Sequence, residues 1–234
     1  MLIFDIEQNT HQWHRARLGI PTASEFDQLV KNNGGLTGAA GQSYAKRLTY
    51  EIITNAPLER VTTKWMERGT DLEPEAVRMY EFLTDRKCET VGFITDDART
   101  AGCSPDRFVG EDGGLEIKCP AGWTHMEYLL DPEHGPQYRQ QIQGTMWLTG
   151  KKWWDRMFYH PLLNPVIVTI KADPAYQKLI AAGVKRIHNL VLINLGKLWR
   201  TDHVEIDNLS PEGLKLMAQI PGFKIPDMEG EIIL

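Results

Sequence analysis

The sequence predicts a single α/β domain with a central mixed β-sheet flanked by helices. The 234 residues are 42% hydrophobic and 24% charged, which is ordinary for a globular protein. Helical stretches are followed by a cluster of short β-rich stretches, a helix, two further strands and a long helix. We therefore expect residues 1–234 to form one domain, with its core over about residues 13–200 and an acidic C-terminal extension over residues 201–234.

The helices are predicted from capping residues and from the spacing of apolar residues. Thr22 or Ser24 is a suitable cap for a helix that ends near Lys31. Pro74 falls inside a later helix, where it starts a new turn or a kink. The longest helix, over residues 174–199, has apolar residues every three or four positions and is amphipathic. The other predicted helices are residues 42–54, 62–83, 126–130 and 137–148.

The strands are predicted from short stretches rich in β-branched and aromatic residues that turn residues separate. An Asp-Asp turn and a Gly-Glu-Asp-Gly-Gly turn divide the first three of them. The predicted strands are residues 90–95, 99–103, 115–119, 153–160 and 166–171.

Charge and composition exclude several classes of protein but leave nucleic acid open as a partner. The net charge of −5 lies wholly in residues 201–234, because residues 1–200 contain 24 basic and 24 acidic residues. An overall negative charge is therefore compatible with a local basic groove. No apolar run reaches the roughly 18 residues of a membrane span, and no secretory signal pattern is present. Three isolated cysteines are typical of a reducing compartment, so we expect a cytoplasmic protein with no membrane partner.

Two acids and a lysine are predicted to converge at one edge of the sheet. Side chains alternate along a strand, so Glu116 and Lys118 point to one side and Ile117 to the core. A hairpin through residues 110–114 would bring Asp106 beside Glu116. Neighbouring carboxylates repel each other, and a hard cation such as Mg²⁺ or Mn²⁺ relieves that repulsion. The residues alone also allow an ordinary half-buried strand with one Glu–Lys surface pair.

Five sequence blocks carry a resemblance to a known family. Pro105-Asp106 followed by Glu116-Ile117-Lys118 resembles the PD-(D/E)xK nuclease signature. The wider pattern resembles the phage lambda exonuclease (YqaJ-like viral recombinase nuclease) family, with all of its blocks in the same order. These blocks are Trp13-His14-x-x-Arg17-Leu18-Gly19-x-x-Thr22-Ala23-Ser24-Glu25, Gly69-x-x-x-Glu73, Cys103-Ser104-Pro105-Asp106, Gly114-Leu115-Glu116-Ile117-Lys118-Cys119-Pro120 and Tyr138-x-x-Gln141-x-Gln143-x-x-Met146-Trp147.

The resemblance implies a restriction-endonuclease-like core and a Mg²⁺-dependent 5′→3′ exonuclease. Such an enzyme degrades one strand of linear double-stranded DNA from 5′-phosphorylated ends to mononucleotides and leaves 3′ single-stranded tails for recombination. The resemblance also implies a homotrimeric ring around the DNA and a phage single-strand annealing protein as partner. A phage or prophage protein of this kind would act in the cytoplasm of the bacterial host.

The same resemblance assigns a metal centre and its catalytic residues. Asp106, Glu116 and the carbonyl of Ile117 match metal ligands, for two Mg²⁺ ions per active site that Mn²⁺ could replace. Lys118 matches the catalytic lysine, which positions or activates water. Glu73 matches an acid that helps to hold metal-bound water.

Further residues match groups that contact the substrate. Gln141 matches a catalytic residue near the scissile phosphate, and Tyr138, three residues earlier, lies on the same helix face. Gln143 is a further candidate for substrate binding. Arg17 and Ser24 match residues that hold a 5′-terminal phosphate, because the planar guanidinium suits phosphate oxygens and Ser24 can add a hydroxyl.

The sequence also departs from the family pattern, and alternatives stay open. The loop at residues 32–34 lacks an arginine that relatives carry, Gly144 replaces a tyrosine, and residues 121–124 lack an expected basic residue. One alternative is a PD-(D/E)xK endonuclease or junction resolvase, because specificity lies outside the shared signature. Another is a non-catalytic DNA-end-binding protein. A zinc site is excluded by the scattered histidines and the absence of a Cys-x-x-Cys pair.

Overall fold

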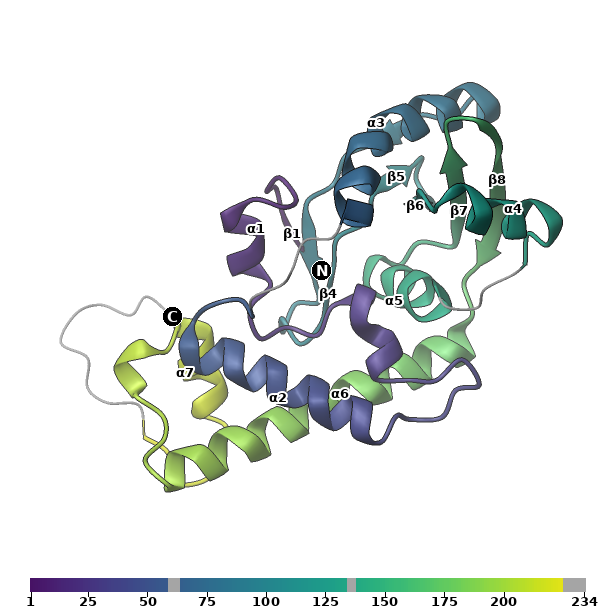
Figure 1. The fold of residues 1–234 in the computed structure, drawn as a ribbon. Helices are drawn as coiled ribbons and strands as arrows, with labels where there is room; N and C mark the ends of the chain where they lie inside the picture. Colours follow the sequence, from purple (N-terminus) through teal and green to yellow (C-terminus); the bar gives the residue numbers. More distant parts are fainter. Residues whose placement is uncertain (59–63, 134–137, 225–234) are drawn as a thin grey trace.

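The fold is built on a five-stranded mixed sheet (Figure 1). The structure is a computed structural model that describes residues 1–58, 64–133 and 138–224. The strand order is β2-β5-β6-β7-β8, and every neighbouring pair is antiparallel except the parallel pair of β6 and β7. A parallel pair needs a long crossover, which the helices α4 and α5 supply here. The strands of this sheet are β2 (Cys88–Glu89), β5 (Arg107–Val109), β6 (Gly113–Lys118), β7 (Trp153–His160) and β8 (Leu163–Lys171).

Helices cover both faces of this sheet, as the alternation of buried residues in β6 and β7 requires. On one face, Ile117 packs in a cluster with Ala76 of α3 (Lys64–Thr84). On the other face, Phe158 packs against Tyr128 of α4 (Gly122–Leu130), and α5 (Arg139–Thr149) packs close by. Glu116 and Lys118 alternate with Ile117, so they share the face of the sheet that α4 and α5 cover.

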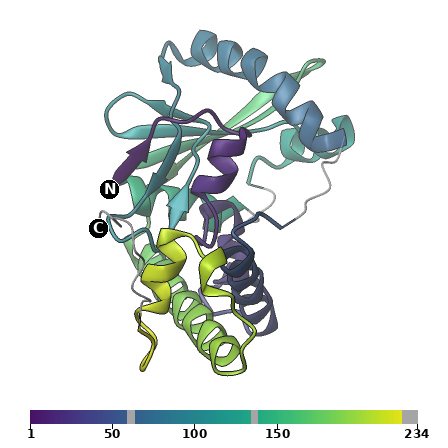
Figure 2. The same ribbon diagram turned by 90° about the vertical axis from the view of Figure 1, so that its left-hand side faces the viewer.

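A second layer lies beyond α5 and holds the largest apolar cluster. Its small sheet has the order β1-β3-β4, and α2 lies side by side with the long α6 (Figures 1 and 2). The described part of the acidic extension packs on this layer through Leu214 and Met217 of α7. The elements of this layer are β1 (Leu2–Phe4), α1 (His11–Ala16), the 3₁₀ helix η1 (Ala23–Gln28), α2 (Ala39–Thr54), β3 (Phe93–Thr95), β4 (Gly102–Cys103), α6 (Pro174–Arg200), the 3₁₀ helix η3 (Ile206–Asn208) and α7 (Pro211–Met217).

Two glycines allow rings to pack directly on the backbone. A Cβ atom at Gly114 would lie 2.2 Å from the ring of Trp154. A Cβ atom at Gly144 of α5 would lie 2.3 Å from the ring of Phe26 in η1. The ring of Phe26 therefore fills the space that a side chain at position 144 would need, and α5 and η1 come closer together than two helices with larger side chains could.

The predicted fold class is confirmed, with differences in individual elements. The helix expected from Thr22 or Ser24 to Lys31 is the short 3₁₀ helix η1, so its predicted type and end were wrong. The strands predicted over residues 90–95 and 99–103 belong to the small second sheet. The elements β1, α1 and α7 were not predicted, because elements of three to seven residues carry too few positions to show a periodicity. None of the helices in the described ranges is both long and apolar enough to cross a membrane.

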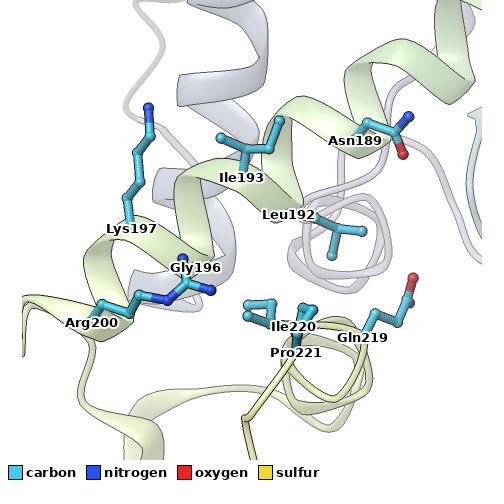
Figure 3. A pocket seen from close by; sticks show the side chains of 9 residues that line it. All are labelled: Asn189, Leu192, Ile193, Gly196, Lys197, Arg200, Gln219, Ile220 and Pro221. Carbon is cyan, nitrogen blue, oxygen red and sulfur yellow. The ribbon is translucent and has the colours of Figure 1, made fainter.

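A groove of about 460 Å³ runs along the C-terminal half of α6 (Figure 3). Its walls are apolar at Leu192, Ile193 and Ile220, with Lys197 and Arg200 at the rim. All nine lining residues come from α6 and residues 219–221, so this groove is separate from the predicted catalytic residues.

Candidate active site

Asp106, Glu116, Lys118 and Gln141 come together at the end of β6. The Nζ atom of Lys118 lies 2.5 Å from Oε1 of Glu116, and Nε2 of Gln141 donates to the same oxygen over 2.6 Å. Oδ2 of Asp106 accepts the backbone N–H of Ile117 at 2.6 Å. The hairpin of β5 and β6 thus brings Asp106 beside Glu116, which is only 2% exposed.

The charges of this cluster are strongly coupled. Burial and the charge of Glu116 hold the pKa of Asp106 well above its usual range, although Lys118 opposes the shift. Burial alone would lower the pKa of Lys118, but the charges of Glu116 and Asp106 outweigh it and raise that pKa. Lys118 is therefore an ammonium group at neutral pH, and it acts as a hydrogen-bond donor to whatever lies between the two acids.

The donor atoms at this position suit a hard divalent cation. In the described part of the chain, no three His, Cys, Asp or Glu side chains form a metal-binding cluster. The carboxylates of Asp106, which is partly exposed, and of the buried Glu116 supply oxygen alone, and Mg²⁺ is usually held by one or two carboxylates, with water and substrate phosphate completing its coordination. Burial and the charge of Glu116 raise the pKa of Asp106, and a cation would offset that charge, so the residues present fit such an ion.

Glu73 approaches this cluster from α3 and is held by an arginine. Nη1 of Arg107 lies 2.7 Å from Oε1 of Glu73 and also donates to the backbone carbonyl of Asp106. The negative charge of Glu73 raises the pKa of Asp106, so the two acids interact. Arg107 was missed in the sequence, although its place directly after Asp106 was a usable signal.

A second cluster forms around Arg17 and a serine of the 103–106 segment. Nη1 of Arg17 donates to Oγ of Ser104 at 3.0 Å, and Nε1 of Trp13 donates to the same oxygen at 2.8 Å. The guanidinium of Arg17 also stacks on the ring of Trp13, with 4.0 Å from Cζ to the ring centroid. The Ser104 oxygen already accepts two N–H groups, so its own hydroxyl proton can donate to a bound oxygen. Ser104 had no role in the sequence prediction, although it stands two residues before Asp106.

Ser24 lies at the edge of this second cluster. Its Oγ is 3.3 Å from Oγ1 of Thr22, which accepts a bond of 3.3 Å from Nη2 of Arg17. Ser24 sits in the first turn of η1, whose N-cap residue is Thr22. Arg17, Ser24 and Ser104 thus form one polar group made from three separate segments.

The two clusters are neighbours on either side of one buried segment. Ser104 belongs to the second cluster and Asp106 to the first, with a single residue between them. Burial raises the pKa of the Cys103 thiol, while the charge of Arg17 lowers it and that of Glu116 raises it. The buried sulfur atom of Cys103 therefore interacts electrostatically with one charged group of each cluster.

Tyr138 and Gln143 are placed differently from each other. The ring of Tyr138, at the N-cap of α5, lies 4.9 Å from the Nζ atom of Lys118. Gln143 is 2% exposed, and its amide joins β8 to α6 by donating to the carbonyl of Lys171 and accepting from the N–H of Asp173, both at 2.8 Å. The structure thus brings Tyr138 to the cluster of Asp106, Glu116 and Lys118 and does not bring Gln143 there.

A further arginine holds the chain directly after β6. Nη1 of Arg68 in α3 donates to the carbonyls of Cys119 at 3.0 Å and Pro120 at 2.7 Å. These two residues follow Lys118, the last residue of β6. Arg68 was missed because a single arginine on a charged helix gives no sequence signal.

Comparison with known proteins shows the family to which the chain belongs. The family model of the YqaJ-like viral recombinase domain matches residues 12–152. Two crystal structures of the alkaline exonuclease LHK-Exo from Laribacter hongkongensis, one in complex with dAMP, share 31% identity with the chain. Each match covers 82% of this chain and 98% of the other, with TM-scores of 0.75 for the dAMP complex and 0.74.

A more distant structure shares the fold alone. The phage related exonuclease from Haemophilus somnus 129PT is 13% identical, with a TM-score of 0.59 over 76% of this chain and 96% of its own. A search of the curated proteins finds no match. The family model spans more than half of the chain, including Arg17, Glu73 and the whole cluster from Asp106 to Gln141, and the chain therefore belongs to the YqaJ-like viral recombinase domain family.

Proposed function

We propose that this nuclease is a Mg²⁺-dependent 5′→3′ exonuclease. It degrades one strand of linear double-stranded DNA from 5′-phosphorylated ends to mononucleotides and leaves 3′ single-stranded tails for recombination. The observation that carries the proposal is the contiguity of two clusters along residues 104–106: an acid–lysine cluster suited to hydrolysis and an arginine–serine cluster suited to a phosphate. The match to LHK-Exo, which was crystallised with dAMP, supports a mononucleotide product.

Five residues have a role in the proposed hydrolysis. Asp106, Glu116 and the Ile117 carbonyl hold the divalent cations, which supply Lewis-acid polarisation of the scissile phosphate when bound. Lys118 donates its N–H groups toward the attacking water and the phosphate oxygens between the acids. Gln141 holds the Glu116 carboxylate in place through its 2.6 Å bond.

Binding of a terminal phosphate by the Arg17 cluster explains the 5′→3′ direction and the release of one nucleotide at each cut. Arg17 offers a planar pair of N–H donors and Ser104 a hydroxyl proton to a terminal phosphate, with Ser24 beside them. A terminal phosphate held there places the next phosphodiester toward Asp106, so each cut releases one nucleotide. Glu73 acts as an outer acid of the metal centre. Tyr138 is assigned to the substrate side, and its position beside Lys118 supports that assignment, whereas the amide of Gln143 joins β8 to α6.

We also propose a homotrimeric ring that encloses the duplex and supplies 3′ tails to a phage single-strand annealing protein in the bacterial cytoplasm. The family resemblance supports this assembly. Enclosure of the duplex would also let a chain with a net charge of −5 retain DNA without a strongly basic surface. Light scattering should give three times the 26.7 kDa mass of one chain, and a monomer would overturn the ring.

The decisive assay compares three DNA substrates with and without Mg²⁺. Linear duplex with 5′-phosphates should be degraded to mononucleotides, linear duplex with 5′-hydroxyls should react more slowly, and closed circular DNA should stay intact. Chelation of Mg²⁺ with EDTA should stop all degradation, and Mn²⁺ should restore it. Cutting of the circle would indicate an endonuclease or junction resolvase instead, and binding without degradation would indicate a DNA-end-binding protein.

The phosphate cluster gives a prediction about end preference. Arg17→Gln should lower kcat/KM on 5′-phosphorylated ends by about 10- to 100-fold, the usual value of charge-assisted hydrogen bonds to a phosphate. Rates on 5′-hydroxyl ends should change by less than about twofold, because those ends lack the group that Arg17 contacts. The measurement is nucleotide release from the two matched duplexes.

Arg15→Gln is the matched control for this prediction. Arg15 lies two residues away on α1 and bonds at 3.4 Å to the side chain of Asn55, outside the Ser104 cluster. It should leave the preference for phosphorylated ends unchanged. An equal loss on both kinds of end in Arg17→Gln would contradict a phosphate-binding role.

A further inference from the structure

We propose that Arg156 of β7 is a positioning residue that holds Pro132 and the ring of Phe158 and so keeps Tyr138 against Lys118. The inference rests on the proposed nuclease function for its kinetic consequence. Its structural consequence, an ordered first turn of α5, is measurable without any activity.

The register of the sheet places Arg156 on the catalytic face. In the parallel pair of β6 and β7, Glu116 lies opposite Arg156 and Lys118 lies opposite Phe158. Residues opposite each other in a ladder point to the same side of the sheet. Arg156 and Phe158 therefore share the side of Glu116 and Lys118, one strand further along.

The guanidinium of Arg156 ties the loop after α4 to this face. Its Nη2 atom donates to the carbonyl of Pro132 at 2.9 Å, and its Cζ atom lies 5.0 Å from the ring centroid of Phe158. Arg156 is only 5% exposed, so these contacts are largely shielded from water. A buried charged donor to a carbonyl is among the stronger hydrogen bonds in a protein, and its loss leaves both groups desolvated.

A chain of ring contacts connects this anchor with the catalytic lysine. The ring of Phe158 lies 6.2 Å from that of Tyr138, and the Tyr138 ring lies 4.9 Å from Nζ of Lys118. Tyr138 is the N-cap residue of α5, three residues before Gln141, so a shift of the Phe158 and Tyr138 rings would also move the start of the helix that carries Gln141.

The planar group of arginine is needed for this task. Arginine can stack on the Phe158 ring and donate sideways to Pro132 at once, whereas a lysine ammonium has one compact head with a strong demand for water. Lysine at this position should therefore keep the charge and lose the anchor.

The test measures kcat and KM of Mg²⁺-dependent nucleotide release for Arg156→Met and Arg156→Lys. Both variants should lower kcat by about 10- to 100-fold, the loss typical of a displacement of about 1 Å at a catalytic group. KM for the 5′-phosphorylated duplex should stay within about twofold, because the Arg17 cluster is untouched. In a Tyr138→Leu background, the same replacements should lower kcat further by less than about threefold, because Arg156 acts through Tyr138.

Arg139→Met is the matched control. Arg139 also bonds to a backbone carbonyl, that of Asn32 at 3.1 Å, and also stacks on a ring, that of Tyr176 at 4.0 Å, but it belongs to the opposite side of α5. It should leave kcat within about twofold. A full additional loss of kcat for Arg156→Met in the Tyr138→Leu background, or an unchanged kcat with Arg156 alone replaced, would overturn the proposal.

Hydrogen exchange followed by mass spectrometry provides the readout that needs no activity. Arg156→Lys, which keeps the buried charge, should raise exchange at least tenfold at the first turn of α5 and leave η1 and α1 unchanged. Unchanged exchange at α5 would overturn the proposal even in an active enzyme. If the wild-type chain degrades no DNA, the proposed function fails, while the exchange experiment still decides whether Arg156 holds the start of α5 in place.

Discussion

Replacing Asp106 with asparagine is expected to abolish Mg²⁺-dependent degradation, by at least about 10³-fold, and to stabilise the metal-free protein. Activity falls because the amide removes one of the two anionic ligands proposed for the cation. Stability rises because the repulsion between Asp106 and Glu116 disappears, while the amide oxygen can still accept the N–H of Ile117. The melting temperature should rise by a few degrees in EDTA, and the rise should vanish when Mg²⁺ is added, because only the wild type gains from the ion.

The pH dependence of stability is a second, independent test that Asp106 destabilises the metal-free protein. The pKa of Asp106 is raised in the folded protein above its value of about 3.9 in the unfolded chain. Between these two values the folded state keeps a proton that the unfolded state has lost, so the free energy of unfolding falls as the pH rises through this window. That fall should be smaller in Asp106→Asn, as measured by urea unfolding at several pH values in EDTA.

Asp112→Asn is the control for the Asp106 prediction. Asp112 is half exposed in the turn before β6 and pairs with Lys152 at 2.8 Å. Its replacement should leave both activity and the Mg²⁺ dependence of the melting temperature unchanged. A fully active Asp106→Asn variant would remove Asp106 from the metal centre and with it the proposed mechanism.

Lys118→Met is expected to lower kcat by about 10²- to 10⁴-fold and, unlike Asp106→Asn, to destabilise the metal-free protein. Methionine keeps the apolar stem but removes the ammonium that lies 2.5 Å from Glu116 and lowers the pKa of Asp106. The two acids then face each other with less compensation. The loss should appear in kcat more than in KM, because the Arg17 cluster that binds the end remains intact.

The two variants Asp106→Asn and Lys118→Met are expected to change the stability of the metal-free protein in opposite directions. Single-turnover rates measure the chemical step, and melting temperatures in EDTA measure the change in electrostatic repulsion between the acids. Lys152→Met is the matched control, because Lys152 forms the same kind of ion pair with Asp112 on an exposed turn. If Lys118→Met stabilised the metal-free protein, the assigned interaction with the two acids would be wrong.

The sequence by itself determined the fold class and the side of β6 on which Glu116 and Lys118 lie. Alternation along Leu115–Lys118 assigns Glu116 and Lys118 to one side, because neighbouring side chains of any strand point to opposite faces. The long amphipathic helix near the C-terminus was predicted almost to its ends, because its 27 residues give many repeats of the apolar spacing. Local rules of this kind need no knowledge of what lies across the sheet.

Only the tertiary structure decided which distant residues share a site. Ser104 meets Trp13 and Arg17, Arg107 pairs with Glu73, and Arg68 bonds to the carbonyls after Lys118, all across 34 or more residues of chain. Such pairings depend on strand order, register and helix packing, for which a single sequence carries no periodic signal. Gln143 is a case in which residues close in sequence lie at different places. It stands two residues after Gln141, but the turn of the helix directs its amide to β8 and α6.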